Sequence, residues 1–466
     1  MADLATPTLP AGGLLDRAIR RITDAWRDMA AAVAPTADES IPAQMRACLA
    51  ARGGEVSARN RAAKLGEAYV AADAEGRATF LRDLASFDAD PAAIAQAAAR
   101  LVDAGEDPPA RAAATAALRR ALEPPRLRLL TQFTTIPDGV KFLVDLRAEL
   151  LALRDADATL AGLEADLRTL LAAWFDIGFL DLQRIDWNAP AALLEKLVGY
   201  EAVHEIRGWR DLKNRLDSDR RCYAFFHPRM PHEPLIFVEI ALVQGLAGSV
   251  QALLDQKAPV LDPREADTAI FYSISNCQRG LAGISFGNFL IKRVVEVLSA
   301  EFRDIKAFAT LSPLPGFRRW LDTTLAKAPP DLLRNGEAVI LQAAIPAAPD
   351  PVAALSTLLA RRAWVRDPAT AKLLEPVLLR LAAHYLLHEG RGKRAADPVA
   401  HFHLSNGARI ERLCPLADTS EKGVKESAAL MVNYLYDPAR IEQHHEDYAG
   451  EGKRGAAQAI RRLLRP

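Results

Sequence analysis

The sequence predicts an all-α domain, a helical bundle, over residues 1–174, followed by an α/β domain over residues 175–466, and three observations support this division. Apolar residues in the first part recur at three- and four-residue steps, which is the period of an amphipathic helix. Short β-branched and aromatic runs, typical of strands, begin only after Trp174. All nine histidines and three of the four cysteines also lie beyond that residue, so we expect the chemistry in the second domain.

Composition and charge exclude several classes of protein. The chain has 466 residues, half of them hydrophobic, which is enough for more than one core. Lys+Arg and Asp+Glu both total 59, which argues against a broad nucleic-acid surface. The cysteines include no C-x-x-C pair, which is typical of a reducing compartment and leaves no thiolate metal site. Because the start lacks a secretory signal and no apolar stretch reaches the roughly 20 residues of a membrane span, we expect a cytoplasmic protein.

The clearest helical pattern in the first part ends at Trp174. Its apolar stripe consists of Leu146, Leu150, Leu153, Leu160, Leu163, Leu167, Leu170 and Trp174, with Asp157 at the one polar position. This spacing predicts a helix that packs one face against neighbouring helices. The first part has no histidine and no cluster of nucleophiles, so we expect it to serve packing or assembly.

The second part alternates strand patterns with helical ones. The runs that predict strands are Cys222–Phe226, Leu235–Leu242, Thr268–Ser275 and, more weakly, Ile305–Thr310. Helical patterns broken by prolines follow. Then Asn406-Gly407, the favoured two-residue turn, predicts a hairpin over His401–Leu413. This mixture indicates a mixed sheet covered by helices.

A glycine-bearing segment joins the third and fourth strand patterns. Its glycines, Gly280, Gly283 and Gly287, let the backbone approach a ligand, and the following helix start can bind phosphate. Lys292 and Arg293 add positive charge one turn later. A glycine turn that merely leads into a helix explains the same pattern equally well.

Two serines are candidates for chemistry. Ser285 lies in a formal G-x-S-x-G, the pattern of a hydrolase nucleophile elbow, but the predicted strand ends near Ser275, which is the wrong context. Ser312 follows the fourth strand pattern. Pro313 favours extended backbone at Ser312, and Pro315-Gly316 turns the chain, so Ser312 is well placed to bind a ligand. An ordinary strand-to-helix turn is the commoner explanation.

The predicted hairpin places His401, His403 and Ser405 on one face of a strand. Histidine titrates near neutrality, so either His401 or His403 could transfer a proton, although structural histidines are more common. We predict no metal site. His401-x-His403 lacks a third ligand, and the helical pair His384 and His388 lacks the glutamate of H-E-x-x-H.

Several segments together resemble the malonyl-CoA decarboxylase family. They are FYSISNCQRGLAGISFGNFLIKRVV, LSPLPGFRRWL, DPVAHFHLSNGARIERL and LMVNYLYD, preceded by WFDIGFLDLQRIDW and RRCYAFFHPRMPHEPL. The similarity covers most of residues 170–440, whereas the first part resembles the family mainly in length and helical character. The resemblance implies a helical assembly domain, commonly tetrameric, and a catalytic domain of the GCN5-related N-acetyltransferase fold.

The resemblance also implies the site residues. Its catalytic serine is Ser312, and its catalytic histidine is His403 rather than His401. The loop that binds coenzyme A is Ala282, Gly283, Ile284, Ser285, Phe286, Gly287 and Asn288. No cofactor is implied, because coenzyme A is part of the substrate.

The implied reaction converts malonyl-CoA to acetyl-CoA and CO2. The thioester carbonyl accepts the electrons, His403 donates the proton, and Ser312 orients the carboxylate or takes part in proton transfer. Two alternatives remain: an acyltransferase of the same fold, and a non-catalytic acyl-CoA-binding scaffold.

Overall fold

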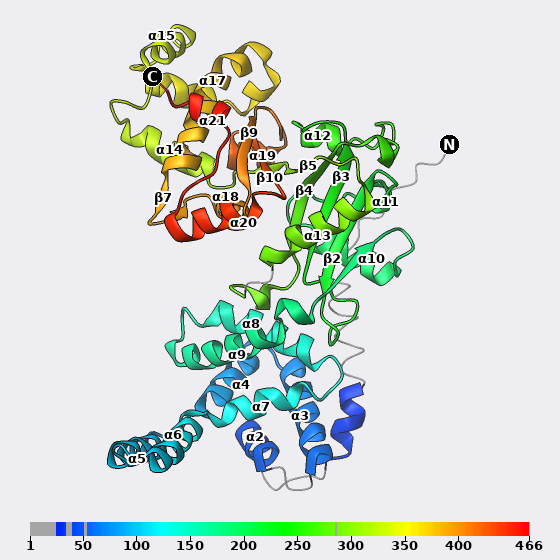
Figure 1. Cartoon of the computed structure of the whole chain (residues 1–466), viewed down its shortest axis with the longest axis vertical. Coiled ribbons are helices and arrows are strands. Elements are labelled where there is room, and N and C mark those ends of the chain that lie inside the picture. The colour runs from blue at the N-terminus through cyan, green and yellow to red at the C-terminus, as the bar shows by residue number, and fades with distance from the viewer. Residues whose placement is uncertain (1–24, 34–39, 51–53, 285–286, 466) are drawn as a thin grey trace. The chain divides into compact units, whose positions relative to one another are not determined.

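The computed structural model describes residues 25–33, 40–50, 54–284 and 287–465, without the side chains of 287–289 (Figure 1). The chain forms two compact units. The first consists of Met1–Asp181 with two later segments, Phe226–Leu235 and Asn276–Phe286, and the second consists of the remainder.

The first unit is helical. Besides a helical stretch over residues 25–31, its helices are α2 (Ile41–Ala50), α3 (Gly54–Ala71), α4 (Ala74–Ser86), α5 (Pro91–Asp103), α6 (Pro108–Leu122), α7 (Pro125–Phe133), α8 (Gly139–Leu153) and α9 (Ala161–Trp174), with short 3-10 turns η1 (Ala158–Leu160), η2 (Ile177–Phe179) and η4 (Arg279–Leu281). Aspartates at 73, 90 and 107 cap the N-termini of α4, α5 and α6 by accepting backbone N–H groups. No strand occurs among the described residues before Asp181, which confirms the predicted helical first part.

The predicted stripe ending at Trp174 spans two helices rather than one. Asp157 accepts a hydrogen bond from the Thr159 N–H (3.1 Å) and begins η1, which leads into α9. Asp157 fits the polar position of one continuous helix in the sequence pattern. In the structure it starts a new helix instead, because its carboxylate accepts a backbone N–H group. The stripe is buried through most of its length, but it ends on Leu171 and Phe175 rather than on Leu170 and Trp174.

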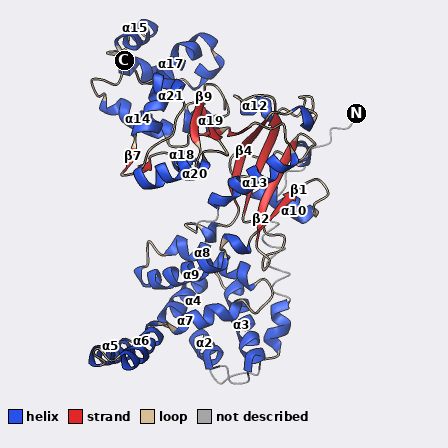
Figure 2. Cartoon of the chain, in the orientation of Figure 1, coloured by secondary structure: helices blue, strands red, loops and turns tan. Residues whose placement is uncertain are grey.

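The second unit contains a mixed sheet (Figure 2). Its strands are β1 (Asp181–Ile185), β2 (Arg220–Phe226), β3 (Ile236–Val243), β4 (Thr268–Asn276), β5 (Ala307–Thr310), β6 (Ser312–Pro313), β9 (Arg409–Cys414) and β10 (Met431–Tyr436). The order is β1-β2-β3-β4-β5-β10-β6, with β9 also paired to β10, and a small separate hairpin is formed by β7 (Gly390–Arg391) and β8 (Arg394–Ala395). The predicted runs are β2 to β5, so the mixed α/β second part is confirmed.

The second unit also contains many helices. They are α10 (Ala191–Tyr200), α11 (Trp209–Arg215), α12 (Val250–Leu253), α13 (Gly287–Glu301), α14 (Phe317–Lys327), α15 (Asn335–Ala344), α16 (Pro351–Ala360), α17 (Pro368–His388), α18 (Pro398–Ser405), α19 (Glu421–Ser427), α20 (Ile441–Glu446) and α21 (Gln458–Arg462). None of the helices in the described ranges is long and apolar enough to cross a bilayer. Strands β4 and β5 are parallel, with Phe271 beside Thr310, and β6, which begins at Ser312, follows β5 closely in the chain.

The predicted hairpin over His401–Leu413 is wrong in its first half. Residues Pro398–Ser405 form α18, which begins with Pro398 in its first turn behind the capping Asp397. The helix ends at Asn406, and Gly407 then adopts a positive φ of 81°. An Asn-Gly pair terminates a helix as readily as it turns a hairpin, because both need a residue in the left-handed region. Only the second half, β9, is a strand.

Candidate active site

Ser312 and His403 meet in the second unit. Ser312 Oγ lies 3.0 Å from His403 Nε2, although the residues are 91 positions apart, and both side chains are buried. His401 points elsewhere, because two residues advance a helix by about 200° rather than returning to the same face. Its Nδ1 lies 2.8 Å from the Tyr448 hydroxyl. The structure therefore brings Ser312 together with His403 and not with His401.

Two tyrosines of β10 complete the surroundings of His403. The Tyr436 hydroxyl lies 2.7 Å from His403 Nδ1, and the ring of Tyr434 stacks on the imidazole at 4.5 Å between centroids. Neither tyrosine was singled out from the sequence. The alternation Tyr434-Leu-Tyr436 on a strand, which places both rings on one face, was the available signal.

The Val432 carbonyl allows one direction to be assigned to the hydrogen bonds around Ser312. Thr310 Oγ1 is 3.5 Å from the Val432 carbonyl, which can only accept, so the Thr310 hydroxyl donates to it and accepts from Ser312 (2.9 Å). Ser312 then accepts the Nε2–H of His403, and His403 Nδ1 accepts the Tyr436 hydroxyl proton. This is the arrangement in which every proton of the chain has an acceptor.

Burial sets the protonation state of this site. It lowers the pKa of His403 to about 3, because the cationic ring would lose its hydration without gaining a nearby anion. Burial likewise raises the pKa of Tyr436 well above its usual value. Both groups are therefore neutral at neutral pH, and the single imidazole proton sits on Nε2, directed at Ser312.

Asp397 joins the two segments that carry this pair. Its carboxylate caps α18 by accepting the N–H groups of Val399 (2.9 Å) and Ala400 (3.0 Å). It also accepts the Gly316 N–H (3.2 Å) from the turn that follows Ser312. One buried carboxylate thus holds the serine turn against the start of the histidine helix.

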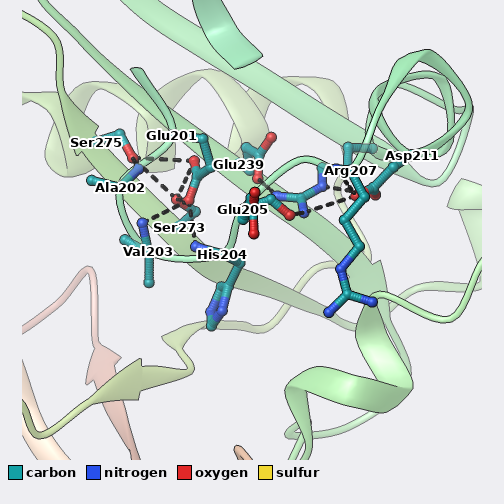
Figure 3. Close-up of polar contacts among 11 residues, drawn as sticks. Glu201, Ala202, Val203, His204, Glu205, Arg207, Asp211, Glu239, Ser273 and Ser275 are labelled. Atoms are coloured by element: carbon teal, nitrogen blue, oxygen red, sulfur yellow. Dashed lines mark hydrogen bonds and ion pairs between the residues drawn. The ribbon is translucent and has the colours of Figure 1, made fainter. Parts of the chain in front are cut away.

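A second polar cluster lies between α10 and the end of β4 (Figure 3). The Glu201 carboxylate accepts the hydroxyls of Ser273 (2.8 Å) and Ser275 (3.1 Å) and the N–H groups of Val203 and His204. These bonds attach the segment after α10 to the strand beside β5. Sequence reasoning missed this cluster, because nothing local indicates that Glu201 reaches residues more than 70 positions away.

Buried charges continue the cluster on the neighbouring strand. Arg215 pairs with Asp211 (3.1 Å) and with Glu239 of β3 (3.0 Å), and all three side chains are buried. Burial raises the pKa of Glu239 to about 8, because desolvation outweighs the attraction of Arg215, whose charge is shared with Asp211. A lone glutamate inside the apolar run Leu235–Leu242 was the sequence signal for a buried ion pair.

The first part of the glycine-bearing segment, residues 276–284, belongs to the first unit. Ala282 (φ −55°, ψ 131°) and Gly283 (φ 77°) form a type II turn closed by the Ile284 N–H on the Leu281 carbonyl (3.0 Å). A β-carbon on Gly283 would meet nothing within 4 Å, so that side of the turn is open.

The rest of the predicted coenzyme A loop is less fully described. Ser285 and Phe286 lie outside the described residues, and Gly287 and Asn288 begin α13. Strand β4 ends at Asn276 and η4 intervenes, so the strand does not run directly into a nucleophile elbow. The predicted positive charges are both paired. Lys292 contacts Glu442 (2.8 Å), and Arg293 contacts Glu296 (2.8 Å).

Comparisons with known proteins cover both parts of the chain. The family model of the malonyl-CoA decarboxylase C-terminal domain matches residues 178–466, and that of the N-terminal domain matches residues 87–175. Over 373 residues the chain is 37% identical to the mitochondrial malonyl-CoA decarboxylase of Anser anser anser, which covers 77% of this chain and 74% of that protein.

Solved structures give the same result. A malonyl-CoA decarboxylase from Rhodopseudomonas palustris is 42% identical, covers 92% of this chain and 100% of its own, and superposes with a TM-score of 0.81. The corresponding protein from Agrobacterium vitis is 40% identical, covers 91% and 100%, and has a TM-score of 0.82.

Proposed function

The chain belongs to the malonyl-CoA decarboxylase family, and we propose that it releases CO2 from malonyl-CoA through the buried pair of Ser312 and His403. The observation that supports this assignment is the 3.0 Å contact between the two side chains. It joins a hydroxyl and an imidazole, and the Tyr436 hydroxyl that bonds the other imidazole nitrogen is neutral.

The reaction has two requirements that the protein must meet. When the bond between the α-carbon and the carboxylate breaks, its electron pair moves into the thioester carbonyl and leaves an enolate, which must be stabilised. The α-carbon must then receive a proton, which gives acetyl-CoA and consumes one proton in each turnover. The thioester carbonyl is itself the electron acceptor, so we propose that no metal or organic cofactor takes part.

His403 is the proposed proton donor. Its Nε2–H already points at Ser312 in the resting protein, where the ring is neutral. A substrate carboxylate beside the ring would raise the pKa of His403, because the cation then gains a partner. Ser312 either orients that carboxylate or passes the proton on. General acid catalysis of this kind contributes about 10²–10⁴-fold.

The proposed binding site for coenzyme A is the loop Ala282–Asn288. The described turn supports this, because Gly283 is exposed and a β-carbon there would meet nothing within 4 Å, which leaves room for a pyrophosphate beside the backbone. Replacing Gly283 by glutamine would occupy that space and would also strain the turn, because φ there is 77°. We expect the KM for malonyl-CoA to rise at least about tenfold while the fold persists. Unchanged affinity for coenzyme A would exclude this loop.

Residues 1–174 form the proposed assembly domain, and residues 175–466 form the catalytic one. Helices α5 and α6 project from the other helices of their unit (Figure 1). They bury little beyond Ala97 and Ala114, while Val102 is 80% and Leu122 53% exposed. We propose that this apolar surface contacts a second copy in a homotetramer. Sedimentation of the full chain as a monomer would refute it. The cytoplasmic location stays a prediction.

One assay separates this function from its alternatives. Purified protein incubated with malonyl-CoA alone should release CO2 and form acetyl-CoA. Turnover that requires an amine acceptor would instead identify an acyltransferase, and binding without turnover would identify a scaffold.

The residue assignment has its own test. We expect His403→Asn to lose most of kcat with little change in KM, since the proton transfer matters in the transition state. Ser312→Ala should also lower kcat, and the double variant should lose less than the product of the two effects. His401→Asn is the matched control, because it lies on the same helix but points away. A crippled His401→Asn beside an active His403→Asn would refute the assignment.

A further inference from the structure

Arg147 of α8 is a buried cation that the proposed reaction does not use. Its side chain is 1% exposed, and it donates through Nη1 to the carbonyls of Gly280 (2.5 Å) and Ala282 (3.0 Å). Its other terminal nitrogen pairs with Glu164 of α9 (2.8 Å), which is also buried. A guanidinium that gives up its hydration needs such partners, and two of them are carbonyls of the glycine-bearing segment.

The same segment lies directly against α8. A β-carbon on Gly280 would stand 1.7 Å from the Val144 carbonyl, so only glycine allows this approach. Gln278 adds a buried bond from its side-chain amide to the Pro234 carbonyl (2.9 Å). These contacts attach the first half of the segment to α8 and to the loop that contains Pro234, before its exposed turn begins.

The bond from Arg147 to Ala282 decides which way the turn presents its amide. In a trans peptide the C=O and the following N–H point in opposite directions. Because Arg147 draws the Ala282 carbonyl toward α8, the N–H of Gly283 is directed to the other side. Gly283 is exposed, and a β-carbon there would meet nothing within 4 Å.

We propose that Arg147 is a positioning residue for substrate binding: it holds the Ala282–Gly283 peptide so that the Gly283 N–H faces the pyrophosphate of coenzyme A. This inference rests on the proposed role of the 282–288 loop. It gives Arg147 of α8 a part in the affinity for coenzyme A. Glu164 supports the arrangement by fixing the guanidinium from the opposite side.

The test compares two substrates of the full-length enzyme. Malonyl-CoA has the pyrophosphate, whereas the malonyl thioester of N-acetylcysteamine lacks it. For Arg147→Lys we expect the KM for malonyl-CoA to rise about tenfold with little change in kcat. A rise of this size corresponds to the loss of one charge-assisted contact. The kcat/KM for the short thioester should stay the same. Equal losses on both substrates, or no loss on malonyl-CoA, would overturn the proposal.

Arg126 supplies the matched control. It is also a buried arginine of the helical unit, bonded to Asp166 (2.6 Å) and to the Ala85 carbonyl (2.9 Å), but it does not contact the loop. Arg126→Lys should lower thermal stability comparably and leave both KM values unchanged. An equal rise in KM for Arg126→Lys would show a general effect of destabilisation and overturn the proposal.

Two further variants keep the outcomes distinct. If Arg147→Lys fails to fold, Glu164→Gln retains the guanidinium but releases one side of it, and the KM for malonyl-CoA should rise by about threefold. A wild-type KM in Glu164→Gln would then overturn the proposal. If Gly283→Gln weakens coenzyme A binding while Arg147→Lys does not, only this inference fails. If neither variant changes the affinity, the loop assignment itself fails.

Discussion

Replacing His403 by glutamine should remove much of the acid sensitivity of the folded α/β unit. The imidazole has a pKa near 6.5 in an unfolded chain and about 3 in the fold, because burial disfavours the cation. Its native pKa is therefore depressed below the unfolded value. For a base this means that stability is fully present above pH 6.5 and is lost as the pH falls toward 3, since the unfolded state binds the proton first.

The magnitude follows from these two values. At about pH 4.5 the protonated form of the unfolded histidine exceeds the neutral form by roughly 100 to 1, while the native histidine is still neutral. This difference lowers the free energy of unfolding by about 2.7 kcal/mol. In urea unfolding, the free energy of unfolding should fall between about pH 7.5 and 4.5 by more in the wild type than in His403→Gln. We expect the difference between the two falls to equal this amount. His401→Gln, at a half-buried site, should differ from the wild type by less.

The same depressed pKa should appear in the kinetics. The kcat/KM profile of the free enzyme should show no ionisation of His403 between about pH 4.5 and 6.5, whereas kcat reports the complex in which substrate raises that pKa. Identical pH dependence of unfolding in the wild type and His403→Gln would refute the buried, neutral imidazole on which the proposed mechanism depends.

Three further predictions concern other buried groups. The pKa of Glu239 is raised from 4.5 to about 8, so the free energy of unfolding should fall as the pH rises through that interval. In urea unfolding, Glu239→Gln should make this fall smaller by about 3–5 kcal/mol. Gly280→Ala should destabilise the helical unit by about 3 kcal/mol in thermal unfolding, since its β-carbon would overlap the Val144 carbonyl. Tyr436→Phe should lower kcat about tenfold or more without raising KM, as steady-state assays would show, because His403 Nδ1 loses its donor.

Much of the fold could be predicted because it depends on local sequence. The periodic apolar residues before Trp174 predicted helices, and the β-branched runs predicted β2 to β5, since a strand or helix must bury its own apolar face. The predictions failed where a residue serves two structures. Asp157 fits a helical stripe and also caps a helix, and Asn406-Gly407 fits a hairpin and also ends one. The residues that pack around each segment decide which of the two structures it adopts.

The sequence alone determined the two-part architecture and, through the resemblance of its segments, the family, whereas the roles of Ser312 and His403 stay predictions. Tertiary structure decided which groups contact one another, because these contacts join residues that are far apart in the sequence. The Ser312–His403 bond spans 91 residues, the Tyr436–His403 bond 33, and the Arg147–Gly280 bond 133. Burial, which makes His403 neutral, is likewise a property of the packed neighbours. No local pattern specifies such pairs, since each depends on where the intervening strands and helices place its partners.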